Sequence, residues 1–205
     1  MEMTQEKNLK LHDDVASCER LKMLKFFSMI HRLKNIKRAG WVRTNVSNPE
    51  SVPDHMYRMA IMSMFIPSSS GVNKEHVMKL ALIHDMAECI VGDITPYDKV
   101  PKEEKHQRER EAMQKLSDLA GPEVGPELYS LWEEYEQQSS PESKWVKDLD
   151  RYEMIHQAFD YEKQENKPAS LQEFFDCTKG TFQHDEIKKW VQELETQREA
   201  HIKQS

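Results

Sequence analysis

The strongest constraint on the fold of this chain is the spacing of its hydrophobic residues, which recur at three- and four-residue intervals along most of its length. One face of an α-helix has this spacing, whereas a half-buried strand alternates polar and apolar residues. No strand-like alternation of any length occurs, and the chain has only 6 glycines. The sequence therefore predicts an all-α fold.

Capping residues and helix breakers mark where the predicted helices begin and end. Residues 1–14 are polar, and we expect a frayed N-terminus there, followed by one domain over residues 15–205. Ser51 is a good N-cap, with Pro53 in the first turn, and Asn73 is a good cap for the next helix. The segment KRAGWVRTNVSNPE is predicted to be an ordered loop. The predicted helices cover residues 15–35, 51–66, 73–89, 101–120, 127–138, 141–163, 171–178 and 184–200.

Composition excludes several classes of protein. A chain of 205 residues with 38% hydrophobic residues suffices for one domain with a core. No apolar run is long enough to span a membrane, and the N-terminus is too polar for a signal peptide, so we expect an intracellular, cytoplasmic protein without membrane association. The 3 cysteines form no C-x-x-C pair, which argues against disulfides and thiolate zinc sites. A net charge of −7 makes polymeric nucleic acid an unsuitable partner.

Titratable residues interrupt the apolar face of the predicted helix over residues 73–89. His84 and Glu88 continue the ridge that begins at Val77, and Asp85 is one step round the helix from His84. Burying these groups costs several kcal/mol for each uncompensated charge. A bound cation would remove that cost.

Two other predicted helices each carry one such residue. His55 lies on a ridge with Met59 and Met62, and Asp150 lies on a ridge with Val146 and Met154. Taken alone, His55 could be a hydrogen-bonded core histidine, and Asp150 could be half of a salt bridge. Together with His84 and Asp85 they form a nitrogen and oxygen donor set that suits a divalent cation such as Mn²⁺, Co²⁺ or Mg²⁺. Four protein ligands leave coordination positions open, as in a catalytic site.

The order of these residues, H…HD…D, resembles the motif of the HD-domain metal-dependent phosphohydrolases. The surrounding segments RAGWVRTNV, PESVPDHMYRMA, LIHDMAECIVGDITP and LWEEYEQQSSPESKWVKDLDRYEMI make the resemblance more specific, and within this family they are similar to the 5′-deoxynucleotidases. The resemblance covers nearly the whole chain from Leu21. It implies an all-α HD-domain helical bundle, a homodimer, and hydrolysis of deoxynucleoside 5′-monophosphates (dAMP, dCMP, dGMP, dTMP) to a deoxynucleoside and phosphate.

The resemblance also implies roles for individual residues. His55, His84, Asp85 and Asp150 would hold the catalytic ion, and Glu88 would be the essential acid or base, with Asp93 as a neighbouring carboxylate. A competing assignment uses Glu88, Asp93 and the carbonyl of Ile94 for a second ion. Arg38 resembles the phosphate-contacting arginine, and Trp41 the tryptophan that lies against sugar and base. From the sequence alone, Trp41 could equally be a buried anchor for its loop.

Two other functions compete with this reading. Guanosine tetraphosphate hydrolases of the same superfamily carry H-D-x-x-E-D, but Cys89 stands here in place of the second acidic residue. A non-catalytic helical binding protein with a structural ion is the other alternative. The presence of Glu88, Asp93 and Arg38 argues against it, because a structural ion would not need them.

Overall fold

The computed structural model describes the backbone of residues 2–204 and the side chains of residues 17–204. In this part of the chain the regular elements are α-helices and short 3-10 helices, which confirms the predicted all-α fold. The chain forms two compact units. The first consists of Met1–Ile36 and Met86–Ser130, and the second of Lys37–Asp85 and Leu131–Ser205.

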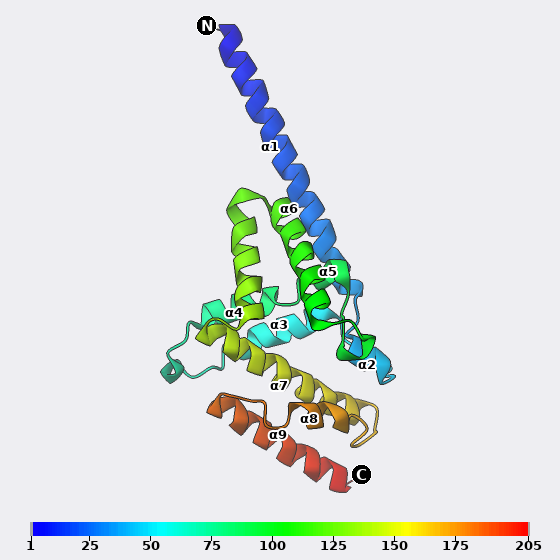
Figure 1. Ribbon diagram of the computed structural model, residues 1–205. Helices are drawn as coiled ribbons and strands as arrows, with labels where there is room; N and C mark the ends of the chain where they lie inside the picture. Colours follow the sequence, from blue (N-terminus) through cyan, green and yellow to red (C-terminus); the bar gives the residue numbers. More distant parts are fainter. Residues whose placement is uncertain (1, 205) are drawn as a thin grey trace. The chain divides into compact units, whose positions relative to one another are not determined.

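The first unit contains the long helix α1 (Glu2–His31), η1 (Arg32–Asn35), α5 (Glu88–Val91), η3 (Pro96–Asp98) and most of α6 (Lys102–Gln137). Helix α5 contacts both α1 and η1. The chain reverses direction within α6 (Figure 1) at Gly121, whose φ of 85° is in the left-handed region. Beyond the turn the two arms approach closely, since a Cβ at Gly125 would lie 2.2 Å from the carbonyl oxygen of Ser117.

The second unit is layered around α7 (Pro141–Gln164). Helices α3 (Val52–Ser63) and α4 (Lys74–Ile83) pack against each other and against one side of α7, and α8 (Gln172–Thr178) and α9 (Asp185–Gln204) lie on the other side (Figure 1). The short α2 (Ala39–Arg43) and η2 (Ser68–Ser70) complete the unit. One hydrophobic cluster joins α2, α7, α8 and α9; it includes Trp41, Ile155, Phe159, Tyr161, Phe174 and Leu194.

The predicted helix caps are present. Ser51 and Asp54 form a capping box at the start of α3, with Pro53 in the first turn. The side chain of Asn73 accepts hydrogen bonds from the amides of Glu75 and His76 at the start of α4. These two caps satisfy polar backbone groups at the N-termini of α3 and α4.

Several predicted helix limits differ from the structure. The helix expected over residues 73–89 ends at Ile83. In a continuing helix the carbonyl of Ala81 would accept a backbone amide, but here it accepts the imidazole N–H of His84. The expected loop after Lys37 contains α2. Backbone helix α1 begins at Glu2, well before Val15, and the side chains of residues 1–16 lie outside the described residues.

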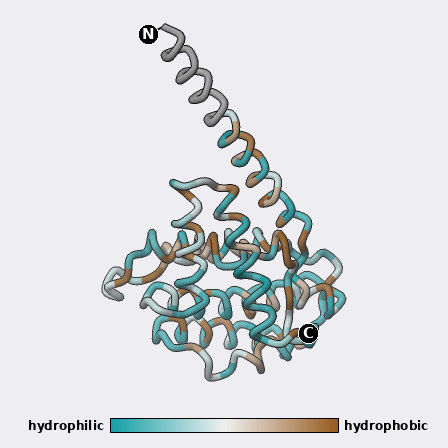
Figure 2. The backbone as a smooth tube through the Cα atoms, turned by 45° about the horizontal axis from the view of Figure 1, so that its top comes forward, coloured by the Kyte–Doolittle hydropathy of each residue, from teal (hydrophilic) through white to brown (hydrophobic). Residues whose placement is uncertain are grey.

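Hydropathy varies along each helix without a long apolar stretch (Figure 2). Among the residues described, no helix is long and apolar enough to cross a membrane.

Candidate metal centre

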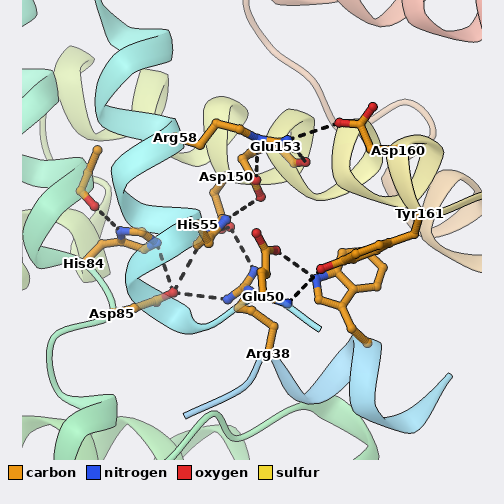
Figure 3. Close-up of polar contacts among 12 residues, drawn as sticks. Arg38, Glu50, His55, Arg58, His84, Asp85, Asp150, Glu153, Asp160 and Tyr161 are labelled. Atoms are coloured by element: carbon orange, nitrogen blue, oxygen red, sulfur yellow. Dashed lines mark hydrogen bonds and ion pairs between the residues drawn. The ribbon is translucent and has the colours of Figure 1, made fainter. Parts of the chain in front are cut away.

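Helices α3, α4 and α7 bring four of the predicted ligands together in the second unit (Figure 3). His55 comes from α3, His84 and Asp85 from the end of α4, and Asp150 from α7. Nε2 of His55 lies 3.3 Å from Oδ1 of Asp150 and 4.0 Å from Oδ2 of Asp85. Nε2 of His84 lies 3.2 Å from the same oxygen of Asp85. Ligand atoms of His55, His84 and Asp150 all lie within 4.8 Å of one another.

Both imidazole rings are held through Nδ1. Nδ1 of His84 donates to the carbonyl of Ala81 at 2.9 Å, and Nδ1 of His55 donates to Oε2 of Glu153 at 2.5 Å. The Nε2 atoms of both rings are buried and make no hydrogen bond of acceptable geometry. These Nε2 atoms therefore face the carboxylates of Asp85 and Asp150.

Each carboxylate is oriented by a neighbouring donor. Oδ2 of Asp150 accepts hydrogen bonds from the hydroxyl of Tyr135 at 3.1 Å and from Nζ of Lys147 at 3.0 Å, which leaves Oδ1 facing His55. Oδ2 of Asp85 accepts a hydrogen bond from Arg38 at 3.2 Å. Both side chains retain 19% exposure, so this part of the cluster is open to solvent.

Arg38 reaches the cluster because two backbone contacts fix its segment. Lys37 and Ser51 form an isolated antiparallel bridge, and the amide of Arg38 donates to the carbonyl of Glu50 at 3.1 Å. The guanidinium then lies beside Asp85, with its second nitrogen 3.9 Å from Oδ1 of Asp150. A fork of N–H donors at this position suits a phosphate group.

The cluster shifts the protonation of its members. Burial would raise the pKa of Asp85, but the effect of His84 is larger and the pKa is lowered. Burial would also raise the pKa of Asp150, but Lys147 and His55 lower it. Burial and Arg38 would lower the pKa of His55, but Glu153 and Asp150 raise it to about 9. Burial, reinforced by Glu153, raises the pKa of the nearby Glu50 to about 7.

These residues fit a divalent cation. Donor atoms that share one ion at about 2.1 Å are separated by roughly 3 to 4 Å, which matches the distances among the His55, His84, Asp85 and Asp150 donors. Two buried imidazole nitrogens without hydrogen bonds are the donors that such an ion takes. The two carboxylates would supply compensating negative charge.

The other predicted site residues on the chain after Asp85 belong to the first unit, so their part in this centre stays a prediction. Glu88 is 3% exposed at the start of α5. Asp93 follows Gly92, which has a left-handed φ of 79°. The carbonyl of Ile94 accepts a hydrogen bond from Nζ of Lys105 at 2.9 Å, which occupies one of its two acceptor positions.

Trp41 is placed differently from the prediction. Its side chain is 2% exposed and packs against Tyr161 and Phe174, with ring centroids 5.4 and 4.4 Å away. Its indole N–H donates to Glu50 at 2.9 Å. This burial agrees with the alternative of an anchor for the loop, and a contact of Trp41 with sugar and base stays a prediction.

Several residues around the centre were not predicted. They are Glu50, Arg58, Tyr135, Lys147 and Glu153. Glu153 stands three residues after Asp150 and Lys147 three before it, so helical spacing alone could have drawn attention to both. Tyr135 and Glu50 carry no such signal, because only tertiary packing brings them to the centre.

Comparison with known proteins now decides the family. The model of the HD domain family matches residues 30–198. The chain belongs to the HD domain family. The mouse (Mus musculus) protein named 5′-deoxynucleotidase HDDC2 is 56% identical over 180 residues, which cover 88% of this chain and 90% of that protein. The human (Homo sapiens) protein of the same name is 54% identical over 180 residues, which cover 88% of this chain and 88% of that protein.

A solved structure agrees with these matches. The HD domain-containing protein YGK1 is 32% identical, with a TM-score of 0.69 over 89% of this chain and 88% of that one. Within the HD domain family, whose hydrolases depend on a metal, the chain groups with the 5′-deoxynucleotidases. The predicted family, the all-α HD fold and the prediction of an enzyme of this type are thereby confirmed.

Proposed function

We propose that this protein is a metal-dependent 5′-deoxynucleotidase that converts deoxynucleoside 5′-monophosphates, such as dAMP, dCMP, dGMP and dTMP, to a deoxynucleoside and phosphate. One observation carries the proposal: two buried imidazoles and two carboxylates converge beside a guanidinium. The relatives most similar in sequence bear the name of this activity. The homodimer expected from the resemblance is part of the same proposal.

His55, His84, Asp85 and Asp150 would hold the catalytic ion, for which Mn²⁺, Co²⁺ and Mg²⁺ are the candidates. Such an ion supplies Lewis acidity to a phosphoryl oxygen and lowers the pKa of water. Lys147 and Tyr135 keep Asp150 turned toward His55. Arg38 binds the non-bridging phosphate oxygens and neutralises the charge that they carry.

Glu88 and Asp93 complete the proposal. Glu88 accepts the proton of the attacking water or donates one to the leaving 5′-oxygen, and Asp93 assists at the substrate. In the competing arrangement, Glu88, Asp93 and the Ile94 carbonyl hold a second ion, and this carbonyl also accepts a hydrogen bond from Lys105. Trp41 contributes by holding the Arg38 segment from within the core.

The proposed activity is tested by measuring phosphate release from dAMP and AMP side by side. Metal-stripped protein is resupplied with Mn²⁺, Co²⁺ or Mg²⁺, and we expect metal-dependent release mainly from dAMP. Release from guanosine tetraphosphate instead would favour the other HD-type hydrolase. No release with any substrate or metal would leave a binding protein with a structural ion.

His84→Ala and His76→Ala form a matched pair of variants, because His76 lies in α4 and His84 is the C-cap of the same helix. His84→Ala should abolish divalent metal binding and hydrolysis with the helical circular dichroism retained. His76 pairs with Glu134 and is not among the proposed ligands, so His76→Ala should keep both. Equal metal content in the two variants would refute the assignment of His84.

Glu88→Ala should bind nucleotide but turn over at least about 100-fold more slowly.

A further inference from the structure

Glu153 is a buried carboxylate that the proposed chemistry does not use directly. It has 0% exposure and lies one turn after Asp150 on α7. Its Oε2 accepts the Nδ1 proton of His55 at 2.5 Å, on the side of the ring opposite to Asp150 and Asp85. His55 is therefore held between the proposed ligands and a charged acceptor (Figure 3).

Arg58 and Asp160 hold Glu153 in turn. Nε of Arg58 lies 2.8 Å from Oε1 of Glu153, and a second nitrogen donates to the backbone carbonyl of Glu153 at 3.2 Å. The remaining guanidinium nitrogen lies 3.2 Å from Asp160. The result is a continuous chain of contacts, Asp160–Arg58–Glu153–His55, built from residues three apart on α3 facing residues of α7.

We propose that Glu153 is a positioning residue for His55, and that it sets the affinity of the centre for its divalent cation. By accepting the Nδ1 proton, Glu153 fixes the tautomer in which the Nε2 lone pair faces the centre. A carboxylate acceptor also makes the ring a stronger donor than a neutral acceptor does. This inference rests on the proposed metal centre, which it deepens.

His84 supplies an internal comparison. Its Nδ1 donates to a backbone carbonyl, a neutral acceptor that no side-chain substitution removes. Of the two histidines, only His55 is held through Nδ1 by a side chain. Glu50, His55 and Glu153 also have ligand atoms within 4.8 Å of one another, but Arg58 already balances the charge of Glu153. A second ion at that place is accordingly disfavoured.

The experiment measures Mn²⁺ binding to metal-stripped protein by calorimetry, without substrate. Glu153→Gln keeps the length of the side chain and loses its charge, whereas Glu153→Asp keeps the charge and withdraws the carboxylate from Nδ1. We expect each variant to bind Mn²⁺ about 10- to 100-fold more weakly than the wild type once the affinities are corrected for protonation of His55. The absorption spectrum of bound Co²⁺ should shift in both variants, because the donor strength of one ligand changes.

Glu162→Gln is the matched control. Glu162 is another fully buried carboxylate of α7, and it pairs with Arg198 at 2.7 Å. This variant should lose thermal stability but keep the wild-type Mn²⁺ affinity and Co²⁺ spectrum. Unchanged affinity and spectrum in the Glu153 variants would overturn the inference and leave Glu153 as a structural partner of Arg58. No Mn²⁺ binding by the wild type would overturn the proposed metal centre itself.

Discussion

At the residue scale, the protonation of His55 links metal uptake to pH. Glu153 and Asp150 raise its pKa to about 9 against the opposing effects of burial and Arg38, so the ring is an imidazolium in metal-stripped protein at pH 7. An ion can bind Nε2 only after the proton leaves. Binding of Mn²⁺ should release a proton, and the apparent affinity should rise up to about tenfold per pH unit below pH 9.

Calorimetry in buffers of different ionisation enthalpy measures that proton. The stability of the metal-stripped protein gives an independent check, because a raised pKa stabilises the fold fully below the unfolded-state value of about 6.5. This contribution should be lost as pH rises toward 9 in the stripped protein and be absent from the loaded protein. Metal uptake without proton release at pH 7 would contradict the raised pKa of His55.

The sequence predicted the proposed ligands better than their partners. His55, His84 and Asp150 could be proposed as ligands because polar residues on apolar helical ridges face inward, and His55 and His84 are indeed buried. Glu50 and Tyr135 meet the centre only through tertiary packing, which leaves no pattern in the sequence. The sequence left two interpretations of Trp41 open, and the packing of Tyr161 and Phe174 around its ring favours the buried anchor.

At the element scale, the N-cap of α4 should contribute to stability without affecting the metal centre. Asn73 satisfies the amides of Glu75 and His76, at the end of α4 opposite to His84. Asn73→Ala should lower the free energy of unfolding by about 1 kcal/mol. Chemical denaturation checks this value, and Mn²⁺ affinity should be unchanged.

Asn73→Asp is the conservative control, because aspartate caps helices about as well as asparagine and its charge favours the N-terminus. A loss of stability in Asn73→Asp equal to that in Asn73→Ala would show that capping is not the cause.

Caps were predictable because their signal is local, as at Ser51 and Asn73. The end of α4 at Ile83 could not be predicted, because it depends on a hydrogen bond from the ring of His84 to the carbonyl of Ala81 rather than on a glycine or proline. Helix α2 is only 5 residues long, too short for hydrophobic periodicity to reveal it.

At the scale of the whole molecule, the two compact units are not contiguous in sequence. Each is assembled from two segments, and the chain passes between the units after Ile36, after Asp85 and after Ser130. The proposed ligand Asp85 is the last residue before one of these crossings. The segments Lys37–Asp85 and Met86–Ser130 are each connected to the other unit at both ends. Unfolding of one unit is therefore expected to affect the other.

We therefore expect the predicted single domain to unfold in one cooperative transition. The 4 tryptophans, Trp41, Trp132, Trp145 and Trp190, all belong to the second unit, so their fluorescence reports on that unit alone. Far-UV circular dichroism reports on helices of both units. The two probes should give the same midpoint in urea, and Mn²⁺ should shift both midpoints upward by the same amount. Separate midpoints, with only the fluorescence transition moved by Mn²⁺, would show that the units are independent domains.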